Sequence, residues 1–284
     1  MTEGSVTQAA VALGITQPAV SCLIGNLEES LGFMLFKRHR GRFQATGEAE
    51  VFLDDAERLL ASYSRTTRTA RDIRDLKAGS LRIAALPAVS MNFIPKLLAN
   101  FVRNRPEISV SLQTRSSVQI KEWISVQLFD IGIVELPADS PAIDCDPLSF
   151  DCLCALPEGH PLMVNVCITP GDLQGEPLIV PNPEHAVHYH LKAAFELQGI
   201  PWRPHIESHL FAPNCRMVAE GAGVGIVDPF TAYDFIDQGL VFRPFEPRIP
   251  YDLGLIYPAL RPRSRLTAEF AEDIKSALRE MLHS

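Results

Sequence analysis

Five polar residues stand at the ends of short β-rich runs, where a fold of alternating strands and helices places its binding sites. Ser90 closes the stretch PAVS, and Ser116 and Ser117 close the stretch TRSS. Serine hydroxyls and the backbone N–H groups at the start of a helix can together hold a carboxylate. A serine at such a turn can also be only a helix cap, so both roles stay open for each of the three.

The other two of the five residues are acids. Glu135 ends the run DIGIVE, and Asp228 ends the strand within VGIVDP. Ligands of open α/β sheets bind outside the carboxyl ends of the strands, so we expect both carboxylates near the mouth of a cleft. There they would accept hydrogen bonds from the ammonium groups of a ligand, or each would pair with a local basic group. If the five residues face one cleft, they would suit a small molecule that carries both a carboxylate and ammonium groups.

The chain after Gly79 supplies the elements that carry these residues. Short β-rich runs alternate there with amphipathic helical runs, which predicts an α/β fold with mainly parallel sheets. The expected strands cover residues 81–86, 108–114, 130–135, 152–157, 177–181 and 224–229. An α/β segment of this length commonly splits into two lobes, which we expect at about 80–162 with 259–284 and at about 163–258.

A second arrangement of side chains lies near the N-terminus. Residues 6–13 follow the spacing of a helix with one buried face, Gly14 stops that helix, and Thr16 can cap a second one. The apolar stripe of the second helix consists of Val20, Leu23, Ile24, Leu27 and Leu31. At 100° per residue Cys22 points away from this stripe. Residues 33–49 then predict a small hairpin, or wing.

Charge is distributed unevenly along the chain. The formal net charge is -8 at pH 7, which argues against indiscriminate nucleic-acid binding. Positive charge gathers in one short cluster in the hairpin, made of Lys37, Arg38, Arg40 and Arg42. Arginines placed there would lie along a nucleic-acid backbone and supply most of the counterion release on binding.

Composition limits the class of protein further. With 46% apolar residues the chain can fill real cores, and no apolar run is long enough to cross a bilayer. The N-terminal residues lack the zones of a signal peptide, so we expect a cytoplasmic protein without membrane contact. The six irregularly spaced cysteines are expected to be reduced thiols. The run HAVHYH lacks a matched second ligand cluster, so we expect no metal and no cofactor.

A long helix is expected between the two regions. From Thr46, a helix cap, a helical pattern runs to about Lys77 and closes at Gly79. Its apolar seam alternates by three and four residues through Ala49, Phe52, Ala56, Leu59, Tyr63, Thr66, Ala70 and Ile73. The pattern allows a surface helix packed on its own domain, but a narrow seam of four heptads favours pairing with a second copy of the chain.

The stretch GSVTQAAVALGITQPAVSCLIGNLEESLG, followed by LFKRHRGRFQAT, resembles the winged helix-turn-helix of LysR-type transcriptional regulators. The resemblance covers nearly the whole chain. The later segments AALPAVSMNFIPKLLANF, IKEWISVQLFDIGIVE, LPEGHPL and EGAGVGIVDPFTA look most like the branch that governs lysine biosynthesis and opine catabolism. Lysine, diaminopimelate and an arginine-derived opine would each suit a site with two carboxylates.

The resemblance implies a fold of the α plus α/β class. It assigns residues 1–45 to a DNA-binding domain, 46–79 to a dimerisation helix, and 80–284 to a two-lobed effector domain like periplasmic binding proteins. It also implies a homotetramer that binds promoter DNA and responds to a small effector, without catalytic residues. The expected DNA-binding residues are Thr16, Gln17, Pro18, Ala19, Ser21, Cys22, Arg38, Arg40 and Arg42.

Two departures from the family pattern define an alternative. Cys22 stands where the family usually has a basic residue, and Met1 matches a position that is internal in relatives. We therefore expect either a start codon placed too far downstream or a truncated chain. Without the first helix, part of the cover is missing from Val6, Ala10, Leu13, Leu23 and Leu27. The alternative is an effector-sensing module with an impaired DNA reader, acting as a decoy or heteromeric partner. An enzymatic function lacks support, because no nucleophile elbow, metal set or phosphate loop is present.

Overall fold

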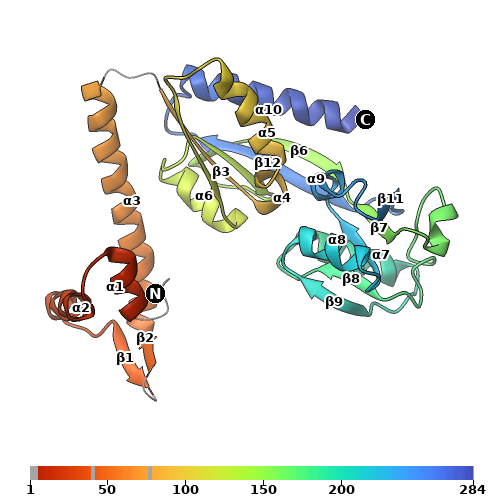
Figure 1. The fold of residues 1–284 in the computed structure, drawn as a ribbon, viewed down its shortest axis with the longest axis horizontal. Helices are drawn as coiled ribbons and strands as arrows, with labels where there is room; N and C mark the ends of the chain where they lie inside the picture. The colour runs from red at the N-terminus through yellow and green to blue at the C-terminus, as the bar shows by residue number, and fades with distance from the viewer. Residues whose placement is uncertain (1–5, 40–41, 76–78, 284) are drawn as a thin grey trace. The chain divides into compact units, whose positions relative to one another are not determined.

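The computed structural model of the chain describes residues 6–39, 42–75 and 79–283. They belong to two compact units, Met1–Arg71 and Asp72–Ser284, each of which is described by itself (Figure 1). Within the described ranges, no helix is both long enough and apolar enough to cross a membrane.

The first unit begins with two helices joined by a tight turn. Helix α1 spans Val6–Leu13 and helix α2 spans Gln17–Leu31. Gly14 has a φ of +66° between them, a conformation that glycine adopts without steric cost. The Thr16 hydroxyl accepts a hydrogen bond from the Ala19 N–H at 3.4 Å and so caps α2. The predicted helix, turn and capped second helix are confirmed.

A two-stranded hairpin follows α2. Strand β1 at Phe36–His39 is antiparallel to strand β2 at Arg42–Ala45, as predicted for the wing. Glu28 on α2 accepts hydrogen bonds through Oε1 from the backbone N–H groups of Leu35 at 2.6 Å and Phe36 at 3.0 Å. One carboxylate therefore fixes the start of the hairpin against α2.

Helix α3 spans Gly47–Asp75 and begins where the sequence predicts. The Thr46 hydroxyl caps it by accepting from the Ala49 N–H at 3.1 Å, and it donates to the Met34 carbonyl at 2.8 Å. Thr46 therefore ties the start of the long helix to the segment before the wing. The predicted end of the helix near Lys77 lies outside the described residues.

The predicted seam of α3 divides into two parts. Phe52 near its start is half-buried within the first unit. Farther along, the Leu59 and Tyr63 side chains are 72% and 70% exposed. The side chains of Ala70 and Ile73 lie outside the described part of the structure. The exposed part of the seam is apolar surface of the kind that a second helix covers.

The second unit contains two five-stranded sheets. The first sheet has the strand order β4-β3-β5-β12-β6. Its strands are β3 (Ser80–Ala85), β4 (Ser109–Thr114), β5 (Ile131–Glu135), β6 (Ile143–Asp151) and β12 (Pro250–Pro258). Its helices are α4 (Pro87–Ser90), α5 (Phe93–Arg103), α6 (Ser117–Ser125) and α10 (Arg265–His283). Helices α5 and α10 cover one face of this sheet and α6 covers the other (Figure 1).

The second sheet has the strand order β11-β7-β10-β8-β9. Its strands are β7 (Leu153–Pro157), β8 (Leu178–Pro181), β9 (Pro204–Ser208), β10 (Val224–Val227) and β11 (Leu240–Pro244). Its helices are α7 (Ala186–Leu197), α8 (Phe211–Ala219), α9 (Pro229–Asp234) and the short 3-10 helix η1 (Pro161–Val164). Buried apolar residues of both sheets form one continuous core.

The prediction of mainly parallel sheets is wrong, because both sheets are mixed. Strand β12 is antiparallel to β5 and β6, and β7 is antiparallel to β10 and β11. The sequence predicted β3, β4, β5, β7, β8 and β10, but it missed β6, β9, β11 and β12. The missed strands contain proline, aspartate or glutamate, residue types that are depleted in strands, so composition concealed them.

The sheets also divide the chain differently from the expected lobes. The chain passes from the first sheet to the second between β6 and β7, and it returns to the first sheet between β11 and β12. Residues 153–157 therefore belong to the second sheet and residues 250–258 to the first. Strands β6 and β12 pair over their whole length, with Pro250 opposite Asp151 and Pro258 opposite Ile143. The two crossings therefore run side by side as one antiparallel ladder.

Gly223, just before strand β10, is a position that accepts only glycine without strain. Its φ is +151°, and a β-carbon added there would lie 2.1 Å from the carbonyl oxygen of Pro177. We expect Gly223→Ala to lower the free energy of unfolding by about 1 to 3 kcal/mol, because the backbone must leave a conformation that only glycine tolerates. Urea unfolding measures this. Gly171→Ala, where the nearest atom is 3.5 Å away, is the matched control, and equal losses in both variants would contradict the prediction.

Candidate functional site

The outer face of α2 presents most of the side chains predicted to contact DNA. Gln17, Pro18, Ser21 and Cys22 are exposed, while Ala19 is half-buried. Gln17 Nε2 donates to Ser21 Oγ at 3.1 Å, so these two polar side chains are held side by side on the surface. Cys22 is a free, exposed thiol on the same helix, as the helical spacing predicted. Contact of this face with DNA stays a prediction.

The apolar stripe beneath that face is buried only in part. Val20 is 5% exposed, whereas Leu23 is 58% and Leu27 is 42% exposed. Assignment of these two leucines to the core is therefore wrong for this structure, although reduced cover over them was expected. Ala10 on α1 is buried, contrary to the same expectation.

The predicted basic cluster falls on the hairpin. Lys37 on β1 is exposed. Arg38 belongs to β1 and Arg42 to β2, while Arg40 lies outside the described residues. Placement of the three arginines along a DNA backbone stays a prediction.

The two sheets of the second unit meet through aromatic side chains of α9. Phe230 on α9 contacts the ring of Phe93 on α5 with centroids 5.4 Å apart, and the ring of Phe150 on β6 at 4.9 Å. Asn92, just before α5, donates a hydrogen bond to the Asp234 carboxylate at the end of α9. These contacts bring the strand ends of both sheets together and bury the residues between them.

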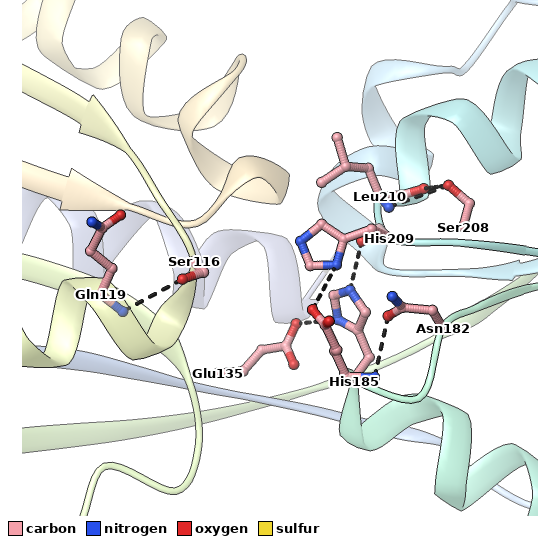
Figure 2. A network of polar contacts seen from close by, with 9 residues as sticks. Ser116, Gln119, Glu135, Asn182, His185, Ser208, His209 and Leu210 are labelled. Atoms are coloured by element: carbon pink, nitrogen blue, oxygen red, sulfur yellow. Dashed lines mark hydrogen bonds and ion pairs between the residues drawn. The ribbon is translucent and has the colours of Figure 1, made fainter. Parts of the chain in front are cut away.

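One predicted effector residue, Glu135, is joined to a histidine of the other sheet (Figure 2). Glu135 Oε1 lies 2.7 Å from Nδ1 of His185, which precedes α7. Nε2 of the same ring lies 2.7 Å from the carbonyl oxygen of His209. The His209 carbonyl and an ionised Glu135 are both acceptors, so when His185 is protonated both of its ring nitrogens donate. The sequence left two partners open for Glu135, a ligand ammonium group or a local basic group. The structure shows a basic group of the chain, His185, as its partner.

The charge of His185 follows the pH. Burial lowers the pKa of its imidazole, but the hydrogen bond and negative charge of Glu135 outweigh burial and raise that pKa above 6.5. A raised folded-state pKa stabilises the fold fully below about pH 6.5, and this contribution is lost as the pH rises through the folded-state pKa. The link between the sheets is therefore strongest in mildly acidic solution.

We expect His185→Gln to lose about 1 to 2 kcal/mol of unfolding free energy at pH 6, the usual contribution of a hydrogen bond to a charged group. The loss should shrink toward pH 8.5, because the parent protein loses the same interaction there. Urea unfolding across this range tests it. His190→Gln, on an exposed position of α7, supplies the control. A loss that is independent of pH would show that His185 contributes packing and not charge.

Asp228, the second predicted carboxylate, is fully buried at the start of α9. Its Oδ1 accepts hydrogen bonds from the backbone N–H groups of Phe230 and Thr231, both at 2.9 Å. Among the described residues, its Oδ2 has no hydrogen-bond partner. Burial raises the pKa of the Asp228 carboxyl to about 6, in spite of the helix N–H groups that lower it. Asp228 is therefore a helix cap that keeps one oxygen free.

The three predicted serines lie at the carboxyl ends of the strands, and each hydroxyl has a local partner. Ser90 is buried and accepts from the Thr114 hydroxyl at 2.9 Å. Ser116 caps α6 by accepting from the Gln119 N–H at 3.5 Å, as Figure 2 shows. Ser117 accepts from the backbone N–H of Glu135 at 2.9 Å. The capping role is therefore real for Ser116, and contact of any of the three with a ligand is untested.

Two buried polar residues of this region, Asn214 on α8 and Tyr251 on β12, were not predicted from the sequence. Asn214 is 0% exposed, and neither its Nδ2 nor its Oδ1 has a partner among the described residues. The Tyr251 hydroxyl is likewise buried without one. The sequence contains one sign of the burial of Asn214. This polar residue lies three positions after Phe211, so it falls on the apolar face of its helix.

A pocket of about 520 Å³ opens beside Tyr251. Its lining includes Glu135, Tyr251 and Asp252 of the first sheet and His190 of helix α7, whereas Asn214, Asp228 and the three serines do not line it. Polar groups that converge at a concave site between two sheets are the usual setting of a small-molecule site.

The remaining histidines and cysteines take separate places. His188 is buried and bonded to the Pro181 carbonyl at 3.0 Å, while His190 is exposed, so HAVHYH does not converge on one point. Across the described residues, no group of three or more metal-binding side chains is found. The six cysteines, all of them described, are free thiols, and Cys152 and Cys154 are core residues as predicted.

Comparison with protein families gives two matches. Residues 1–50 match the bacterial regulatory helix-turn-helix protein of the lysR family, and residues 74–279 match the LysR substrate binding domain. The second match contains the pocket and all five predicted effector residues.

Several curated proteins are similar over most of their length. The regulatory protein NocR of Agrobacterium tumefaciens (strain T37) is 35% identical over 99% of this chain and 94% of its own. The transcriptional activator protein LysR of Escherichia coli (strain K12) is 34% identical over 100% and 92%. OccR of Rhizobium meliloti, named for an octopine catabolism/uptake operon, is 32% identical over 86% and 81%.

A solved structure has the same fold. The crystal structure of full-length CbnR with its target DNA superimposes with a TM-score of 0.71 and 20% identity, covering 96% of this chain and 94% of that one. The likeness extends over both the helix-turn-helix and the two mixed sheets.

Proposed function

Because this chain belongs to the LysR family of bacterial transcriptional regulators, we propose that it controls transcription in response to a small amino-acid effector that carries a positive charge. The chain is a DNA-binding transcription regulator and not an enzyme. The identity of its effector, its effector-binding residues and its oligomeric state are what we propose here.

On the DNA side, α2 enters the major groove of promoter DNA and the wing lies along the backbone. Gln17, Ala19 and Ser21 then reach base edges, and Thr16 reaches a phosphate. The exposure of Gln17 and Ser21 on one face of α2 supports this orientation.

On the effector side, one observation carries the proposal: Glu135 and Asp228 both lie near a single basic residue, His185. Burial of two carboxylates between the sheets is expensive unless positive charge balances them. The three serines at the strand ends are placed to receive the carboxylate of the same effector. OccR, whose name refers to octopine, and the branch resemblance make lysine, diaminopimelate and opines the first compounds to test.

The exposed seam of α3 supports dimerisation of the chain through that helix. Leu59, Leu60 and Tyr63 are large apolar side chains left in solvent on a helix of 29 residues. A dimer of dimers with the regulatory domains is the assembly we propose, and sedimentation of the full chain measures it.

Fluorescence anisotropy with DNA taken from upstream of its own gene tests the function. We expect a specific complex that weakens steeply with salt, and a change in affinity when L-lysine, meso-diaminopimelate or octopine is added. Effector binding without any specific DNA complex would instead favour the decoy or heteromeric partner. No response to any of the three compounds would overturn the effector class.

A further inference from the structure

We infer that Asn214 and Tyr251, together with Asp228, form the subsite that receives a primary ammonium group of the effector. This inference rests on the proposed function and adds to it two recognition residues and a choice between ligand classes. It also separates the roles of the two carboxylates, because only Asp228 is left to the ligand.

The first support is the state of the buried polar atoms. Asn214, Asp228 and Tyr251 are at most 1% exposed, and within the described residues Asn214 Oδ1 and Nδ2, Asp228 Oδ2 and the Tyr251 hydroxyl have no hydrogen-bond partner. Buried polar groups in native proteins are almost always bonded, and an unpaired one is costly. Three such residues in one region indicate that a polar group of another molecule satisfies them.

The second support is their proximity. Phe211, one turn before Asn214 on α8, contacts the ring of Tyr251 at 5.7 Å and the ring of His185 at 5.2 Å. The negative charge of Asp228 raises the pKa of the Tyr251 hydroxyl, after burial, and that of the Cys215 thiol beside Asn214. Phe211 and Cys215, which flank Asn214 on α8, therefore connect this part of the helix with Tyr251 and Asp228, so the three residues lie in one region between the sheets.

Charge balance indicates the sign of the missing group. Glu135 forms an ion pair with His185 at 2.7 Å, whereas the Asp228 carboxylate accepts from helix N–H groups and forms no ion pair of its own in the described chain. Because His185 is paired with Glu135, the buried Asp228 carboxylate is left without a paired cation of its own. An effector that supplies it also satisfies the unpaired oxygen of Asp228.

Hydrogen-bond geometry indicates which cation fits. A planar guanidinium prefers to donate two parallel hydrogen bonds, one to each oxygen of a carboxylate. Asp228 cannot offer both, because Oδ1 already accepts two backbone N–H groups. An ammonium has three donors around one nitrogen, and Asp228 Oδ2, Asn214 Oδ1 and the Tyr251 oxygen are three acceptors. The subsite therefore selects lysine or diaminopimelate over octopine, which has a guanidinium and no primary ammonium.

Calorimetric titration of the full chain tests the inference, with L-lysine, meso-diaminopimelate and octopine as probes. We expect Asn214→Leu and Tyr251→Phe each to weaken binding of L-lysine or meso-diaminopimelate roughly tenfold or more, as loss of a hydrogen bond to a charged group does. Tyr257→Phe is the matched control, because Tyr257 lies on the same strand with a hydroxyl that is also buried and unpartnered among the described residues. It should bind within about twofold of the parent.

The outcomes separate the inference from the proposed function. If the parent protein binds none of the three probes, the effector class and the subsite are both overturned. If it binds L-lysine but Asn214→Leu and Tyr251→Phe bind equally well, the unpaired atoms hold water only and the subsite alone is wrong. Tighter binding of octopine than of the two amines would overturn the choice of ammonium. Thermal melts of each variant exclude a folding defect as the cause of lost binding.

Discussion

Asp228→Asn should give a protein that is more stable than the parent at pH 7.5 and that no longer binds a cationic effector. Asparagine caps a helix about as well as aspartate, so the two hydrogen bonds at the start of α9 are kept. What the substitution removes is a fully buried negative charge. Loss of that charge favours the fold and abolishes the attraction for an ammonium group.

The size of the gain follows from the pKa of the Asp228 carboxyl, which burial raises from 3.8 to about 6. A carboxyl with a raised folded-state pKa stabilises the fold below its unfolded pKa, and this is lost as the pH rises from about 4 through 6. A shift of roughly two pKa units at about 1.4 kcal/mol each makes the cost on the order of 3 kcal/mol at neutral pH. Asn carries no such cost, so the variant should be more stable by up to about 3 kcal/mol at pH 7.5 and by only about 1 kcal/mol at pH 4.5.

Urea unfolding of both proteins at the two pH values measures the difference. The titratable groups around Asp228 are Glu135, His185, Tyr251, Cys152 and Cys215, and all of them are present in both proteins. Their own titration therefore largely cancels in the comparison.

Asp237→Asn, a change of the same charge at an exposed position, is the control and should have little effect at either pH. Equal stability of Asp228→Asn and the parent at pH 7.5 would show that the carboxyl is neutral or already balanced there. Undiminished lysine binding by Asp228→Asn would remove Asp228 from the effector site.

A residue that costs stability and is nonetheless buried is best explained by what it binds. The fold needs only a cap at the start of α9, which asparagine or serine also supplies. Aspartate adds a charge that the described chain leaves without a cation of its own. Binding of an ammonium group would offset much of this loss of stability, so the effector should stabilise the folded protein.

Local chemistry made much of this architecture predictable from the sequence. Thr16 and Thr46 cap helices through hydrogen bonds to residues three positions later, and Gly14 ends a helix through its own backbone conformation. Such features depend on neighbours in the chain, so the sequence displays them directly. The ends of strands β5 and β10 were predictable for the same reason, and with them the positions of Glu135 and Asp228.

The missed features depend on contacts between distant segments. The pairing of β6 with β12 joins residues about a hundred positions apart, and neither strand has a composition that predicts a strand. The partner of Glu135 is His185, fifty positions away, which as a sequence residue belonged only to a weak histidine run. Asn214 became informative only when its complete burial was known. The sequence therefore placed the two carboxylates at strand ends, but only the folded structure shows that they have different partners.

Cys22→Arg should tighten binding to the promoter DNA and steepen its dependence on salt. Cys22 is exposed on the face of α2 that also presents Gln17 and Ser21, so an arginine there would project toward the groove. A bidentate arginine contact with a base contributes about 1 to 3 kcal/mol of discrimination, which corresponds to roughly 5- to 150-fold in affinity. If the new side chain binds a phosphate instead, the logarithmic salt slope should grow by about one.

Anisotropy titrations at several salt concentrations distinguish these contacts from a general effect of charge. Ser30→Arg is the matched control, because it adds the same charge to an exposed position near the other end of α2. Recognition helices contact bases mainly through their N-terminal residues, so Ser30→Arg should change affinity much less. Equal gains from both variants would mean that the added charge acts at long range and that Cys22 does not face the groove. A gain confined to Cys22→Arg would place the thiol at the DNA surface and show that the reader works with one contact fewer than an arginine would supply.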